Sequence, residues 1–556
     1  MLFAMLILIT RVHGTIFMLA LFHLLFLLPW LLLHLPDTSM RRLQLSIFTN
    51  LLLKFTLLCL ALLVVLPLTN MGLPNLIKQS TVGFDDSTHI FLTQADTQSS
   101  GFVLKPTIKG LAAYPQGWHY VTSLFLSGTE TYIGHGDLRT TLAVYRVMNA
   151  IWWLSLLLLA LCLILVASGR NNRKPINFGS QILISGCFVV LYAVLIYPNI
   201  AYAATSFIAT ITLLTALFIT LLLRGNTEDL QLKRFLWVVS CALAVATTYT
   251  WILSGLIAIC ALILALLAFH DPTRPKKLFE ELRKYRFELF GAIPAIAAAG
   301  VQVLIEAHYG SKATITAIGG IIEPNHLLFL VLALVTVFVL ARRGKGDFAY
   351  SNADLLSLFS TPYILVLLVY AIQMWNVGTL TYYYSKVAYI AYFFLFLLFA
   401  AVISDIFRNL EQGAQRTRNY LSVVLVAILI VAFNVNTHFI FYALHREGAA
   451  TKPLASKMAE LITAGVPAYD IVVFTENTYQ EDVLSDHFLV MVSPTTPPTR
   501  WKLNEQLIQN DTNAFLKTLQ TYANRSVPTY ILVSSNSKNL VEKSLRAGNY
   551  KVILAD

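Results

Sequence analysis

Side chains able to do chemistry are concentrated between residues 83 and 120 of an otherwise strongly apolar chain. This stretch includes an acidic pair followed by a histidine, in the string Asp85-Asp86-Ser87-Thr88-His89. Either carboxylate could take a proton from a hydroxyl group or hold a divalent cation, with His89 one helical turn away. Alternatively, the aspartates cap a short helix predicted over residues 87–94, because Asp is favoured at helix starts.

The same stretch ends in a second motif, Tyr114-Pro115-Gln116-Gly117-Trp118-His119. Trp118 and His119 could stack on a sugar ring and hydrogen-bond a hydroxyl or phosphate group. The structural alternative is that Tyr114 and Trp118 are anchors at a membrane–water interface, where both residue types are enriched.

A third motif, Tyr382-Tyr383-Tyr384-Ser385-Lys386, precedes a long apolar run. A lysine at the start of a helix favours a bound anion such as phosphate, because the helix dipole and the ammonium charge act together. Lys386 could instead extend its ammonium to the membrane surface above an aromatic belt. Glu323 and His326 lie in another loop, where they contact substrate or simply face solvent.

The composition places these motifs in a polytopic membrane protein. Hydrophobic residues make up 57% of the 556 residues and charged residues 12%, which a soluble protein could not accommodate. The net charge of +11 does not indicate nucleic-acid binding, because Lys and Arg cluster between the apolar segments. The five cysteines all lie in apolar segments and are interpreted as small buried hydrophobic residues.

About twelve segments are apolar and long enough to be membrane-span candidates. They cover residues 14–35, 45–69, 142–167, 180–198, 203–223, 235–250, 251–269, 287–305, 327–341, 353–375, 387–406 and 420–441. The loops rich in Lys and Arg are predicted to be cytoplasmic. The first long loop (residues 70–140), the Lys386 motif and the C-terminal region then all face the extracytoplasmic side of a cell membrane.

Residues 1–445 form the predicted membrane domain. Residues 446–556 are predicted to form a small extracytoplasmic α/β domain with a mostly parallel sheet. Helices are expected over residues 452–464, 503–522 and 538–547, and strands over 469–475, 487–492, 529–534 and 550–554. An acidic group in this domain is expected to be a solvated face. It comprises Glu476, Glu481, Asp482, Asp486 and His487.

Together, the three motifs and the architecture resemble the GT-C superfamily of integral-membrane glycosyltransferases, in particular bacterial arabinofuranosyltransferase-like members. The resemblance rests on Asp85-Asp86 with His89, on Tyr114–His119 and on Tyr382–Lys386. It implies a polyprenyl-phosphate sugar as donor and a cell-envelope glycan or protein as acceptor. Direct displacement would invert the anomeric centre.

The resemblance also implies roles for individual residues. Asp85 or Asp86 would be the general base, and Lys386 with Tyr383 and Tyr384 would bind the donor phosphate. The sugar and acceptor pocket would be lined by His89, Tyr114, Trp118, His119, Glu323 and His326. A divalent cation is left open, because no third acid supplies a clear metal site.

Two other functions compete with this interpretation. A transporter or flippase of lipid-linked sugars would place ionisable groups near the membrane midplane, whereas the predicted spans are nearly free of charge. A non-catalytic envelope protein would explain the C-terminal domain but not the polar stretch at residues 83–120.

Overall fold

The computed structural model of this chain is mostly helical, with one small sheet. It describes residues 51–81, 84–99, 117–133, 137–168, 178–192, 203–224, 230–268, 349–376, 378–380, 382–409, 449–493, 496–545 and 548–556, and a few positions between 292 and 304. Three predicted spans, at residues 14–35, 327–341 and 420–441, lie outside these ranges, as does most of the span at 287–305.

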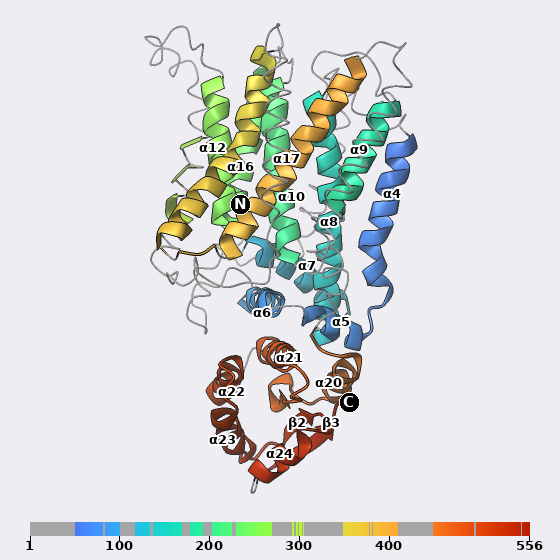
Figure 1. Cartoon of the computed structure of the whole chain (residues 1–556), viewed down its shortest axis with the longest axis vertical. Helices are drawn as coiled ribbons and strands as arrows, with labels where there is room; N and C mark the ends of the chain where they lie inside the picture. Colours follow the sequence, from blue (N-terminus) through green and yellow to red (C-terminus); the bar gives the residue numbers. More distant parts are fainter. Residues whose placement is uncertain are drawn as a thin grey trace.

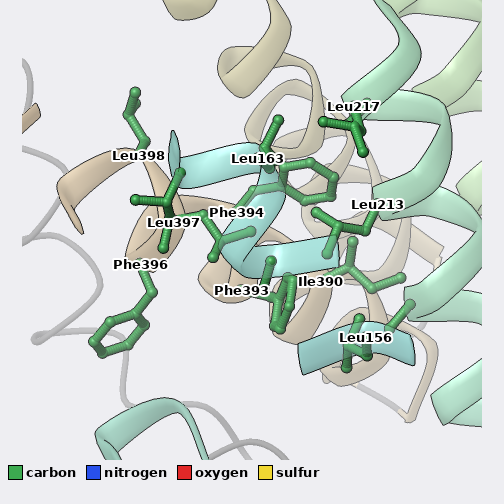
Figure 2. Close-up of a cluster of buried hydrophobic side chains, with 14 of the residues drawn as sticks. Leu156, Leu163, Leu213, Leu217, Ile390, Phe393, Phe394, Phe396, Leu397 and Leu398 are labelled. Carbon is green, nitrogen blue, oxygen red and sulfur yellow. The ribbon is translucent and has the colours of Figure 1, made fainter. Parts of the chain in front are cut away.

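Within the part of the chain that the structure describes, eight apolar helices run side by side along the longest axis of the molecule (Figure 1). They are α4 (Leu51–Val65), α8 (Leu138–Ser168), α9 (Phe178–Leu191), α10 (Ala203–Arg224), α11 (Leu230–Thr250), α12 (Ile252–Ala268), α16 (Ala349–Asn376) and α17 (Tyr382–Asn409). Their facing side chains form one large buried cluster, in which aromatic residues of α17 such as Phe393 and Phe394 pack among leucines of α8 and α10 (Figure 2). This packing fixes the position of α17, and therefore of the third sequence motif at its start.

Within the described residues, one helix meets both the length and the hydropathy expected of a membrane span, namely Leu138–Ile164 of α8. Six further helices among these residues contain shorter apolar stretches, of 10–17 residues each.

A break separates α11 from α12 at Trp251, as the sequence predicted. The amide of Gly255 donates to the carbonyl oxygen of Trp251 (3.0 Å). Gly255 packs so closely on Thr248 that a Cβ atom placed there would lie 2.5 Å from the Thr248 Cα. The close approach therefore requires glycine and holds Trp251 at the turn.

At one end of the bundle the structure describes three further helices: α5 (Leu73–Ser80), α6 (Phe84–Ser99) and α7 (Gly117–Ile133). The predicted helix over residues 87–94 is confirmed, and α6 extends it at both ends. In Figure 1, α6 is seen nearly end-on between the bundle and the C-terminal domain.

The C-terminal region contains a three-stranded parallel sheet in the order β1-β2-β3, which confirms the predicted parallel sheet. Its elements are α20 (Lys452–Thr463), η8 (Ala468–Asp470), β1 (Ile471–Val473), α21 (Tyr479–Met491), α22 (Pro498–Ile508), α23 (Thr512–Ala523), β2 (Thr529–Val533), α24 (Lys538–Ser544) and β3 (Tyr550–Leu554).

Two predicted elements of this domain were wrong. The strand expected at residues 487–492 is the end of α21, which Thr478 caps by accepting a hydrogen bond from the Glu481 amide (3.1 Å). A short apolar run is equally compatible with a buried helix, and here both faces of the run are buried. The single helix expected at 503–522 is two helices, because Asn510 has a φ of 57° and Asp511 caps α23.

Apart from Glu476, which is exposed, the acidic group of the C-terminal domain is buried and is not a solvated face. Asp486 is buried and paired with Arg500 (2.5 Å), which also donates to the Ile471 carbonyl oxygen (2.9 Å). Asp482 accepts hydrogen bonds from the backbone amides of Thr475 and Glu476 (both 2.8 Å). These carboxylates tie α21 to the end of β1, and their role is structural.

Candidate active site

The acidic motif opens α6, and its second aspartate is fully buried. Asp86 Oδ2 accepts from Arg146 Nη2 of α8 (2.9 Å), and Asp86 Oδ1 accepts from the Tyr145 hydroxyl (3.1 Å). The Asp86 side chain has 0% exposure and that of Arg146 has 6%. An acceptor hydroxyl would have to displace one of these partners to reach the carboxylate, so the geometry disfavours Asp86 as a general base.

Arg146 also fixes the corner between α5 and α6. Its Nη2 atom donates to the Gln79 carbonyl oxygen (2.6 Å) and to the Ser80 hydroxyl (3.3 Å). The Ser87 hydroxyl donates back to the Ser80 carbonyl oxygen (3.3 Å). The start of α6 is therefore held against α8 by one buried guanidinium group.

The two histidines predicted to line a sugar pocket contact each other. His89 Nδ1 and His119 Nε2 are 2.6 Å apart, and the rings are stacked with centroids 4.9 Å apart. Both side chains are buried, with exposures of 3% and 1%. Because two imidazole nitrogens at this distance share a proton, one ring donates and the other accepts.

Lys386 belongs to the same cluster. Burial, together with the smaller effect of the positive charge of Lys386, lowers the pKa of His89 from 6.5 to about 3. The Lys386 Nζ atom lies 5.9 Å from the centroid of the Trp251 ring, within the range of a cation–π contact. His89 is therefore neutral at physiological pH, and Lys386 brings a buried positive charge to the site.

The start of α7 packs against the end of α11. A Cβ atom at Gly117 would lie 3.0 Å from the Tyr249 carbonyl oxygen and 3.2 Å from the Thr250 Cα. This close approach brings Trp118 and His119 to the break that carries Trp251. The second and third sequence motifs are thereby joined through the α11–α12 turn.

Trp118 lies on an aromatic wall beside the acidic pair. Its ring is 6.0 Å from that of Tyr145 and 5.5 Å from that of Phe207, measured between centroids. The side chain is 1% exposed. Trp118 therefore packs on the residue that donates to Asp86, while its predicted stacking on a sugar stays a prediction.

The other predicted site residues are described less fully. Asp85 lies in the first turn of α6 and Tyr383 in the first turn of α17, where the structure describes their backbone. Tyr384 is buried and packs edge-on against Tyr370, with centroids 6.0 Å apart. Tyr114, Glu323 and His326 lie outside the described residues.

Sequence reasoning missed four residues of this cluster: Tyr145, Arg146, Trp251 and Asp96. Asp96 is 1% exposed. Burial raises the pKa of the Tyr120 hydroxyl, and the negative charge of Asp96 adds to this effect. A signal for Asp96 was present, because Asp86, His89, Thr93 and Asp96 follow a spacing of three, four and three residues. That spacing places all four on one face of a helix.

Within the described ranges, no group of three or more His, Cys, Asp or Glu side chains could hold a metal ion. Comparison with known proteins identified no matching family, no matching curated protein and no matching solved structure.

Proposed function

We propose that this chain is a polytopic membrane glycosyltransferase that moves a sugar from a polyprenyl-phosphate donor to a cell-envelope glycan or protein on the extracytoplasmic face. In this proposal the apolar helices are membrane spans, about twelve in the whole chain. The observation that carries the proposal is that Lys386, His89 and His119, from three separate sequence motifs, come together in the structure. The two imidazoles are in contact, and Lys386 lies 5.9 Å from the Trp251 ring, next to the end of α11 on which Gly117 packs.

Lys386 has the properties needed to bind the donor phosphate. Negative charge develops on the phosphate as its bond to the sugar breaks, and a preorganised positive charge stabilises it most effectively where water is excluded. Lys386 is 8% exposed and lies beside an indole ring and a neutral imidazole. A buried ammonium in such surroundings favours an anionic ligand.

Of the two aspartates, Asp85 is assigned as the general base. Asp86 already accepts from Arg146 and Tyr145 and acts as a positioning residue. In the reaction, the acceptor hydroxyl gives its proton to Asp85 while its oxygen bonds to the anomeric carbon. The bond from that carbon to the phosphate oxygen breaks at the same time, and the phosphate leaves with the electron pair towards Lys386.

The test is sugar transfer by the purified protein in lipid, with a panel of polyprenyl-phosphate sugars and product detection by mass spectrometry. Asp85→Asn should lower the rate at least about a hundredfold, as loss of a general base does, without changing the thermal stability. Transfer at the normal rate by Asp85→Asn would refute the assignment of the base. Movement of the lipid-linked sugar across the bilayer without transfer would favour a flippase instead.

Donor binding is tested separately at Lys386. Lys386→Ala should raise the KM for the donor more than the KM for the acceptor, because the ammonium is assigned to the phosphate. Lys54→Ala is the matched control, since Lys54 is an exposed lysine on α4, away from the cluster. Equal effects of Lys386→Ala on donor and acceptor would argue against phosphate binding.

A further inference from the structure

We infer that the C-terminal domain holds α6 in its active position, so that residues of α21 and α22 control sugar transfer without contacting substrate. This inference rests on the proposed function for its effect on catalysis. The structural part, that the domain orders α6, is independent of that function. Three sets of contacts between the domain and the α5–α6 region support it.

The first contact is on the back of α6. The face with Asp86, His89 and Asp96 is buried towards the bundle side, as their contacts with α7 and α8 show. The opposite face packs against the C-terminal domain in a small hydrophobic cluster. Its members are Phe91, Leu92 and Ala95 of α6, Met491 of α21 and Trp501 of α22.

The second contact is a pair of hydrogen bonds from backbone amides to Thr81, at the corner before α6. The Ala449 amide donates to the Thr81 carbonyl oxygen (3.0 Å), and the Ala450 amide donates to the Thr81 hydroxyl (3.2 Å). Arg146 holds the residues immediately before this corner, Gln79 and Ser80. The first residues of the C-terminal domain and the Asp86–Arg146 pair thus both contact the turn between α5 and α6.

The third contact joins α20 to α5. Leu454 and Met458 of α20 lie in one buried hydrophobic cluster with Leu76 and Ile77 of α5. Figure 1 shows α20 and α21 on the side of the domain that faces α5 and α6, with α24 at its far end. The domain therefore contacts α6 along the face that points away from the bundle, and it also contacts the turn and helix that precede α6.

These contacts have a physical consequence for α6. A helix of 16 residues is marginal on its own in water, so its order depends on packing. Its inner face carries a polar stripe about 15 Å long, from ten residues at 1.5 Å each. Ile90 is buried beside this stripe, but the face as a whole provides less apolar burial than an ordinary core face. The apolar burial on the opposite face, against α21 and α22, therefore contributes much of the stability of α6. This stability keeps Asp86 in contact with Arg146 and His89 in contact with His119.

Hydrogen–deuterium exchange on the full-length protein tests the structural part. Met491→Asp puts a charge against Phe91 and Leu92, and it should speed exchange of the α6 amides at least about tenfold while α8 and α17 stay unchanged. Leu540→Asp is the matched control, since Leu540 is 39% exposed on α24. Trp501→Ala is a milder second variant in case Met491→Asp unfolds the domain, and Trp501→Phe should restore slow exchange.

The same variants are then assayed for transfer. Met491→Asp and Trp501→Ala should lower kcat at least about tenfold with little change in the donor KM, because Lys386 on α17 is untouched. Unchanged exchange of α6 in both variants would overturn the inference, and faster exchange with a normal kcat would overturn its catalytic part. If the wild-type protein transfers no sugar from any donor, the proposed function fails while the exchange result still decides whether the domain orders α6.

Discussion

Replacing Asp86 by asparagine is expected to destabilise the protein strongly. The carboxylate and the Arg146 guanidinium are 2.9 Å apart, with side-chain exposures of 0% and 6%. Asparagine keeps the shape but leaves a buried positive charge without its counter-charge. Breaking a buried pair in this way costs about 3–5 kcal/mol of the free energy of unfolding, because the remaining charge stays desolvated.

The double variant separates the ion pair from the loss of shape. Removing both charges, with Asp86→Asn and Arg146→Met together, should recover part of the loss, since no charge is then left buried. A coupling energy of about 2 kcal/mol or more is expected from this cycle. Glu460→Gln is the control, because its pair with Lys457 is exposed and its loss should change stability by less than about 1 kcal/mol.

The measurement is a denaturant titration of each purified variant in lipid–detergent micelles, followed by tryptophan fluorescence. A loss below about 1 kcal/mol for Asp86→Asn would show that the pair is not structural. The reason for assigning the base to Asp85 would then disappear. A large loss combined with measurable residual transfer would support the division of roles between the two aspartates.

Three further outcomes are expected. Because the pKa of His89 is about 3 in the fold and 6.5 in the unfolded chain, the unfolded state binds more protons between these values, so stability should fall as pH drops below 6.5. His89→Gln should flatten that dependence by up to about 1.4 kcal/mol per pH unit, as measured by titrations between pH 4 and 7. Gly255→Ala should lower the melting temperature and the affinity for the donor, because the new Cβ would lie 2.5 Å from the Thr248 Cα. Gly300→Ala is the control and should change neither quantity, because there is open space around Gly300. Arg500→Met should unfold the C-terminal domain in thermal scans by leaving the Asp486 charge buried.

The sequence was informative wherever a signal was local. Long apolar runs predicted the helices of the bundle, and the boundary between the predicted spans 235–250 and 251–269 coincides with the break at Trp251. Alternation of helical and strand patterns predicted the parallel sheet. The run at residues 487–492 misled because four to eight apolar residues fit a buried strand and a buried helix equally well.

The site could be predicted only in part, because its partners are distant along the chain. Arg146 follows Asp86 by 60 residues, so no local spacing links the two. Trp251 lies near Lys386 because α11 and α12 pack against the rest of the bundle. Asp96 was different, because its spacing from Asp86 and His89 on one helix face was visible in the sequence and was not used.

The charges in the cluster also indicate which part of the donor the cluster would bind. Asp86 and Arg146 compensate each other within a buried pair. His89 is neutral, since burial and the charge of Lys386 hold its pKa far below physiological pH. Lys386 adds a positive charge to this cluster, with its Nζ atom 5.9 Å from the centroid of the Trp251 ring. A phosphate group entering from the bilayer would lose its hydration but gain this charge, whereas a neutral glycan would gain little from it. The cluster is therefore better suited to hold the donor through its phosphate than through its sugar, and recognition of the particular sugar must come from other residues of the pocket.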